Sequence, residues 1–205
     1  MDFIDRRTLV CRHNPVLLSF EPASPLSVGN GEFAFTADST GLQSFPELYD
    51  SSVELSTQFH LKGSAERSYC GVPLCTQSQW GWHTFPLPEG LSISDFQMEL
   101  FDAHGRKVGY PTNAKGQEEL YGWLRQNPHR LNLGRLGLRL RGRSDGRLLT
   151  PRDFTDIVQT LDLWTGILDS RFCVEGERVV VATCCHPQID MVAVTINSRL
   201  VERGQ

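Results

Sequence analysis

Residues 156–197, DIVQTLDLWTGILDSRFCVEGERVVVATCCHPQIDMVAVTIN, set the architecture of this 205-residue chain. Apolar and polar side chains alternate along them with a period of two, which is the pattern of a strand with one buried face. Glu175-Gly176, near the middle of the stretch, is a residue pair suited to a tight turn between two strands. The stretch therefore predicts a meander of strands over 156–163, 167–174, 178–184 and 190–197.

Shorter alternating runs occur earlier in the chain. In the first, Phe33, Phe35 and Ala37 face one side of a strand, while Thr36 and Asp38 face the other. Together with the meander, these runs predict about ten strands in total. The other runs are 53–61, with Val53, Leu55, Thr57, Phe59 and Leu61; 93–101, with Phe96, Met98 and Leu100; and 136–141, with Leu136, Leu138 and Leu140.

Helical patterning is confined to QEELYGWLRQN, residues 117–127. This segment predicts a helix of about two or three turns that ends at Asn127-Pro128, because a proline disfavours helical backbone in the residue before it. Long segments rich in Gly, Pro and Ser lie around it, at 62–90 and 102–116. The sequence therefore predicts an all-β fold, an antiparallel β-sandwich with long loops and one short helix, in a single domain over residues 1–205.

The composition argues against some classes of partner and location. The formal net charge is -4 and the pI about 5.9, which disfavours nucleic acid or an anionic membrane as the main partner. The first ten residues, MDFIDRRTLV, are too charged for a signal peptide. No segment approaches the roughly 18 consecutive apolar residues that a membrane span requires. We therefore expect a cytoplasmic protein with no membrane contact, whose six cysteines are mostly reduced and buried.

A basic cluster follows the predicted helix. It lacks the interleaved aromatic residues that single-stranded nucleic acid stacks on, so we expect no nucleic-acid site here. The spacing puts Arg135, Arg139 and Arg141 on one face of the following strand, and we expect that face to be solvated. His129 and Arg130, just before it and near a turn, are better candidates for anchoring a partner domain. The cluster consists of Arg135, Arg139, Arg141, Arg143 and Arg147.

Asn30-Gly31, within PLSVGNGEFAFTAD at 25–38, has two interpretations. The pair suits a two-residue type I′ hairpin turn, in which both central residues have positive φ. Alternatively, the missing side chains of Gly29 and Gly31 allow this loop to approach a ligand or a neighbouring domain closely. The residues alone do not choose between these two hypotheses.

The segment CTQSQWGWHTFP, residues 75–86, is the most unusual in the chain. It places Trp80, Trp82, His83 and Phe85 within six positions, in a region too rich in Gly and Pro for a core strand. Large rings on a loop either fill a gap beneath it or stay exposed as a platform. On a platform, the C–H faces of a sugar would pack against the indoles, and His83 or Gln79 would bond its hydroxyls. Both interpretations remain open at this stage.

Motifs for metals, cofactors and nucleophiles give no candidates. The sequence contains no C-x-x-C pair, no H-E-x-x-H, no G-x-S-x-G elbow and no phosphate loop, so no metal or cofactor is predicted. Glycoside hydrolysis generally uses two carboxylates facing each other across the scissile bond. None of the available carboxylates is singled out as catalytic, and most are expected to be solvated: Glu32, Asp38, Glu47, Asp50, Asp95, Asp102 and Asp153.

Several longer stretches carry a family resemblance. They are PLSVGNGEFAFTADSTGLQSFPE, PLCTQSQWGWHTFP, HGRKVGYPT, WLRQNPHRLNLGRLGL and LDLWTGILDSRF. In this order, and over nearly the whole chain, the sequence resembles the N-terminal region of six-hairpin, (α/α)6-barrel glycoside hydrolases, the maltose-phosphorylase-like family.

The resemblance implies a supersandwich-like N-terminal β-domain that packs on a following (α/α)6 barrel. In such proteins the barrel supplies the carboxylic acid that assists cleavage of a glycosidic bond by water or phosphate. No stretch of this sequence offers the twelve amphipathic helices of a barrel, so we expect the N-terminal part of a longer glycoside hydrolase or phosphorylase. This domain would be non-catalytic, with carbohydrate and the missing C-terminal barrel domain as its partners.

Two rival hypotheses remain. One is a free-standing carbohydrate-binding module, and the other is a chain that is itself catalytic, with two facing carboxylates about 5–10 Å apart. In the favoured hypothesis the hairpin turn lies at the domain junction, and the platform residues contact sugar or the partner domain. The predicted contact residues are Asn30, Gly31, Gln79, Trp80, Trp82, His83, His129 and Arg130.

Overall fold

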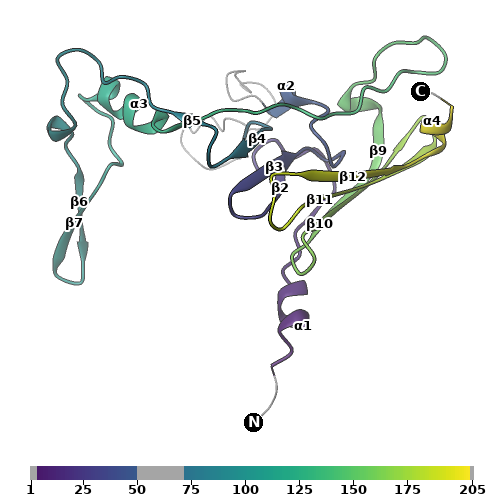
Figure 1. The fold of residues 1–205 in the computed structure, drawn as a ribbon, viewed down its shortest axis with the longest axis horizontal. Coiled ribbons are helices and arrows are strands. Elements are labelled where there is room, and N and C mark those ends of the chain that lie inside the picture. The colour runs from purple at the N-terminus through teal and green to yellow at the C-terminus, as the bar shows by residue number, and fades with distance from the viewer. Residues whose placement is uncertain (1–3, 50–71, 204–205) are drawn as a thin grey trace, which may run out of the picture. The chain divides into compact units, whose positions relative to one another are not determined.

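The computed structural model describes residues 4–49 and 72–203. The chain divides into two compact units: one contains the residues up to Ser78 and from Asn132 onward, and the other is Gln79–Leu131. Most helices and strands of both are labelled in Figure 1. Most of the regular structure is strand, in antiparallel sheets with a few short helices, so the fold is all-β.

The first unit contains a five-stranded antiparallel sheet in the order β1-β9-β10-β11-β12. Its last four strands are the meander predicted from residues 156–197, and each pairs with the next along the chain. Glu175 and Gly176, between β10 and β11, have φ values of 49° and 78°, which confirms the predicted tight turn. The strands are β1 (Val16–Leu17), β9 (Phe154–Asp162), β10 (Ile167–Val174), β11 (Glu177–Cys185) and β12 (Val192–Asn197).

A three-stranded sheet, β2 (Leu26–Gly29), β3 (Phe33–Ala37) and β4 (Thr76–Ser78), supplies the second layer. Phe33, Phe35 and Ala37 are all buried, as their alternation predicts. They belong to one hydrophobic cluster with the inward residues of the five-stranded sheet, such as Phe172 and Val181. The two sheets therefore share a core, as in a β-sandwich.

Residues 38–45 contribute a polar layer to this core. Most of the carboxylates were expected to be solvated, but Asp38 is an exception, because its side chain is fully buried. Its carboxylate accepts hydrogen bonds from the backbone N–H groups of Thr40 (2.8 Å) and Phe45 (2.9 Å). Burial nevertheless raises the pKa of Asp38 above its usual value. Gln159 donates from its amide to the Asp38 carbonyl (2.7 Å) and to the Ser170 hydroxyl (2.9 Å), which ties the segment to β9 and β10.

The predicted strand at 136–141 is wrong as a regular strand, although its apolar side chains pack as expected. Leu138 and Leu140 pack against the core. Leu136, however, bonds Gln43 on both sides: its carbonyl accepts from the Gln43 backbone N–H (2.7 Å) and its N–H donates to the Gln43 side chain (3.2 Å). At Leu136, Gln43 thus supplies the hydrogen bonds that a neighbouring strand would otherwise supply. The predicted run at 53–61 lies outside the described residues.

The chain leaves the first unit after β4 and re-enters it at residue 132, and these two points are hydrogen-bonded to each other. The Leu133 N–H donates to the Thr76 carbonyl (2.8 Å), and the Thr76 N–H donates to the Asn132 side chain (3.0 Å). Two short helices, α1 (Arg6–Cys11) and α4 (Arg199–Glu202), also belong to this unit.

The second unit is built from two small sheets and one helix. The helix predicted over 117–127 is confirmed as α3 (Glu118–Gln126), and Asn127 after it is extended. The run predicted over 93–101 is wrong in its first half, where a short 3-10 turn forms, and Leu100 is 64% exposed in the strand that follows. The elements are β5 (Trp82–His83), β8 (His129–Arg130), β6 (Glu99–Ala103), β7 (Arg106–Tyr110) and the 3-10 turn η1 (Ile93–Asp95).

The prediction of a single helix is wrong. Besides α3, the described part of the chain contains α1, α4, α2 (Pro46–Tyr49) and the 3-10 turn η2 (Pro151–Asp153). The longest of these extra elements has six residues, too few to show a helical apolar pattern in the sequence. Among the described residues, no helix is long and apolar enough to cross a membrane.

Gly41 offers a direct test of the polar layer. It has a φ of 80°, and a Cβ added there would lie 2.9 Å from the Ser170 hydroxyl and 3.1 Å from a Val181 methyl. Gly176 has a similar φ of 78°, but nothing lies within 4 Å of its added Cβ. Gly176→Ala should cost about 1–2 kcal/mol for the left-handed backbone alone. Gly41→Ala should cost about 1–3 kcal/mol more, because it also overpacks the core.

Urea unfolding of the two variants, compared with the wild-type protein, measures this difference. Equal losses of stability in Gly41→Ala and Gly176→Ala would show that the packing around Gly41 is looser than the structure indicates.

Candidate functional site

The ladder between β5 and β8 brings together the candidate residues of the second unit. Trp82 pairs with Arg130, and His83 pairs with His129, although the two strands are far apart in the sequence. The Arg130 guanidinium donates to the Gln79 carbonyl (2.8 Å), which fixes the start of the segment against β8. We call this cluster the aromatic face; it consists of Gln79, Trp80, Trp82, His83, Phe85, His129 and Arg130.

Three rings of the aromatic face contact one another. The His83 ring meets Phe85 edge-on at 4.6 Å and His129 edge-on at 4.9 Å, between ring centroids. His83 Nε2 lies 3.0 Å from His129 Nδ1, so one imidazole donates a hydrogen bond to the other. Phe85 was one of the four rings noted in the sequence but was not among the predicted contact residues. Its contacts with both histidines add it to the site.

The two tryptophans of the aromatic face are exposed. Trp80 is 66% and Trp82 is 51% accessible to solvent, so neither indole is a buried plug beneath the loop. The loop is held by other residues: Trp123 of α3 donates from its indole N–H to the carbonyls of Phe85 and Pro86, both at 3.0 Å.

Asn127, just after α3, adds to this support. Its side chain accepts from the Phe85 N–H (2.7 Å) and donates to the Trp123 carbonyl (2.7 Å). Sequence reasoning assigned Trp123 and Asn127 only to the helix and its end, and no local pattern marked them as supports of the aromatic face.

The chemistry available at the aromatic face is that of binding and orientation. Exposed indoles offer flat apolar surface, and the imidazoles and guanidinium beside them offer hydrogen-bonding nitrogen atoms. The segments 79–86 and 127–131 contain no Asp or Glu, so they supply no carboxylic acid for acid catalysis.

Asn30 and Gly31 lie in the first unit, at the β2–β3 turn. The prediction of positive φ at both residues is wrong: Gly31 has a φ of 95°, but Asn30 is not in the left-handed region. The Asn30 side chain instead accepts from the N–H groups of Glu32 (3.0 Å) and Phe33 (2.8 Å). It also donates to the carbonyl of Ile189 (3.3 Å), so Asn30 braces the turn against the β11–β12 connection.

Gly29 is required by the hairpin itself, because an added Cβ would lie 2.5 Å from the Phe33 carbonyl oxygen. At Gly31 an added Cβ would have no atom within 4 Å among the described residues, so its backbone conformation alone requires glycine.

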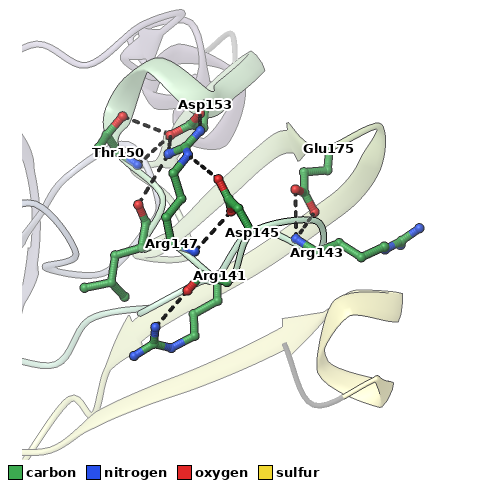
Figure 2. A network of polar contacts seen from close by, with 9 residues as sticks. Arg141, Arg143, Asp145, Arg147, Thr150, Asp153 and Glu175 are labelled. Carbon is green, nitrogen blue, oxygen red and sulfur yellow. Dashed lines mark hydrogen bonds and ion pairs between the residues drawn. The ribbon is translucent and has the colours of Figure 1, made fainter.

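The segment with Arg135, Arg139 and Arg141 is not a regular strand as predicted. Figure 2 shows the contacts of Arg141, Arg143 and Arg147. Arg147 donates through Nη1 (2.9 Å) and Nη2 (2.5 Å) to the two carboxylate oxygens of Asp153, a bidentate pair. Its Nε lies 3.3 Å from Asp145. Thr150 donates to Asp153 through its N–H (2.7 Å), so the carboxylate also closes the 3-10 turn η2.

A second group of contacts links this loop to the β10–β11 turn. The Arg143 N–H donates to the Glu175 carboxylate (3.0 Å), and the Arg143 guanidinium lies 3.9 Å from Glu177. Arg203, after α4, donates to the same Glu177 (2.9 Å). Arg141 donates to the Gly146 carbonyl (2.8 Å). These arginines therefore organise the 141–153 loop and do not form a row of unpaired cations.

Metal-binding clusters and cysteines add no further candidate site in the described part of the chain. No group of three or more His, Cys, Asp or Glu side chains there could hold a metal ion. Five cysteines there are free thiols, as expected, but they are only half-buried, whereas buried thiols were expected. They are Cys11, Cys75, Cys173, Cys184 and Cys185.

Comparison of this chain with family models, curated proteins and solved structures finds no match. The family resemblance noted in the sequence therefore remains a prediction.

The Arg147–Asp153 pair predicts a measurable titration. The hydrogen bond from Arg147, followed by that from the Thr150 N–H, holds the pKa of Asp153 below its usual 3.8. In Arg147→Met, this carboxyl should titrate at a higher pH in carbon-detected NMR, closer to 3.8 but still below it because Thr150 remains.

The sign for stability follows from the lowered pKa. A folded-state pKa below the unfolded value stabilises the protein above pH 3.8, and this contribution disappears as the pH falls through the folded-state pKa. Arg147→Met should therefore lose more stability at pH 7 than at low pH. An unchanged Asp153 titration in this variant would contradict the bidentate pair.

Proposed function

We propose that this chain is a non-catalytic β-sandwich domain of a carbohydrate-active enzyme, a glycoside hydrolase or phosphorylase, and that its aromatic face contacts sugar. The observation that carries the proposal is the exposure of Trp82 on the β5–β8 ladder, where it pairs with Arg130, and of Trp80 in the turn before β5.

Large exposed rings grouped in one place point to a binding surface, because scattered apolar residues are ordinary but clustered ones rarely stay uncovered. A sugar matches this surface in two ways. Its C–H faces pack on indole rings, and its hydroxyls exchange hydrogen bonds with imidazole and guanidinium nitrogens. Trp123 and Asn127 hold the loop through hydrogen bonds to the backbone of Phe85. The rings are therefore positioned before a ligand arrives, which lowers the entropy cost of binding.

The enzyme context rests on the family resemblance. In that context an (α/α)6 barrel domain packs against the β-sandwich and provides the carboxylic acid for glycosidic cleavage. The absence of any carboxylate from segments 79–86 and 127–131 agrees with a division of labour in which the aromatic face binds and another domain reacts.

A free-standing carbohydrate-binding module is the second candidate. It is favoured by the position of the aromatic face within one compact unit, Gln79–Leu131, in which β8 and α3 hold it. The two candidates differ in one measurable property: a module binds sugar by itself, whereas a companion domain lining a pocket binds it strongly only when joined to its barrel.

Isothermal titration with maltose and longer maltooligosaccharides tests the proposal on the chain alone and on a fusion to an (α/α)6 barrel domain. Trp80→Ala and Trp82→Ala should each weaken binding by about 30-fold, the equivalent of roughly 2 kcal/mol for removing an aromatic anchor. Trp164→Ala is the matched control, because Trp164 is 49% exposed but lies in the β9–β10 turn of the other unit.

The proposal is rejected if no sugar binds in either form, or if Trp164→Ala weakens binding as much as Trp82→Ala does. Thermal melting of each variant separates a loss of affinity from a loss of folding.

A further inference from the structure

Strand β12 ends the five-stranded sheet, and within the described residues no strand pairs with its outer side (Figure 1). The opposite edge of the sheet is much shorter. There the last strand, β1, has only two residues and follows Pro15, so it offers little backbone for pairing.

The backbone groups open on β12 follow from the ladder. Hydrogen-bonded and non-hydrogen-bonded pairs alternate along an antiparallel ladder. The His186 N–H donates to the Met191 carbonyl (2.9 Å), so the next pair, Cys185–Val192, is non-hydrogen-bonded. Continuing the alternation, residues 193, 195 and 197 bond to β11. The N–H and C=O groups of residues 192, 194 and 196 therefore point outward from the sheet.

Among the described residues, those of this edge carry none of the side-chain protection against pairing that edge strands usually have. The segment Met191–Asn197, MVAVTIN, contains no charged residue and no proline, and it is rich in β-branched side chains. Met191 and Ile196 are exposed along it. Asp190, which bonds Ser78 (2.6 Å), and α4 bound the open stretch at its two ends.

We propose that β12 pairs with β12 of a second copy of this chain, antiparallel, so that the two five-stranded sheets form one continuous sheet. The pairing places Val194 opposite Val194 of the second copy and Val192 opposite Ile196. This register joins the three outward-pointing positions of one edge to the same three positions of the other.

A second copy fits because the edge is complementary to itself. Paired residues in an antiparallel ladder face the same side of the sheet, so a two-fold axis must pass through a residue position. With the axis at Val194, Ala193 lies opposite Thr195 and Met191 opposite Asn197. No charge meets a like charge, and Val192 of the second copy covers the exposed side chain of Ile196.

The test is sedimentation velocity of the full chain over a range of concentrations. The wild-type protein should shift with concentration from its 23.1 kDa monomer to twice that mass. Val194→Pro removes an N–H that points to the open edge and leaves the bonds to β11 in place, so the variant should stay monomeric.

Ile196→Lys is a second variant, which places a charge on the edge without changing the backbone, and it should also stay monomeric. Val201→Lys is the control: Val201 is 55% exposed on α4, away from the edge, and this variant should dimerise like the wild type. Far-ultraviolet circular dichroism establishes that each variant is folded.

A wild-type protein that stays monomeric, or folded Val194→Pro and Ile196→Lys variants that still dimerise, would overturn the proposal.

Discussion

The sandwich depends on how one polar segment is held between two apolar sheets. The buried carboxylate of Asp38 accepts backbone N–H groups on both sides of the turn, including that of Phe45, and this fixes the segment in shape. Its outward carbonyls, at Asp38 and Gly41, then accept from Gln159 of β9 and Thr183 of β11. A buried polar group is costly unless it is bonded, so this arrangement admits few alternative registers of the two layers.

Much of the fold follows from the sequence because long alternating runs leave little choice. The strands from Phe154 to Asn197 and the helix before Pro128 are such cases. Alternation fails where the hydrogen-bond partner is not a strand: Leu136 alternates correctly with Leu138 but bonds to Gln43. Alternation also fails to predict the burial of Asp38. Strand β3 ends at Ala37, and the chain then turns into the core, where a period of two no longer applies.

The sequence indicated the residues of the aromatic face but not how they come together. The density of rings around Trp82 marked one strand, and a histidine next to an arginine marked the other, but their pairing is a long-range contact that spacing cannot reveal. Trp123 has the spacing of an ordinary apolar helix residue, yet its indole N–H supports the loop. Asn30, conversely, had a functional interpretation, and its side chain is used to brace a turn.

The bonds between Thr76 and residues 132–133 have a consequence for modularity. The chain leaves the first unit and returns to it at adjacent points, so Gln79–Leu131 is an insertion between two neighbouring positions of that unit. Such positions tolerate excision and grafting. A short linker in place of the insertion would preserve the parent scaffold, and the excised segment could be transplanted to another host as an independent cassette.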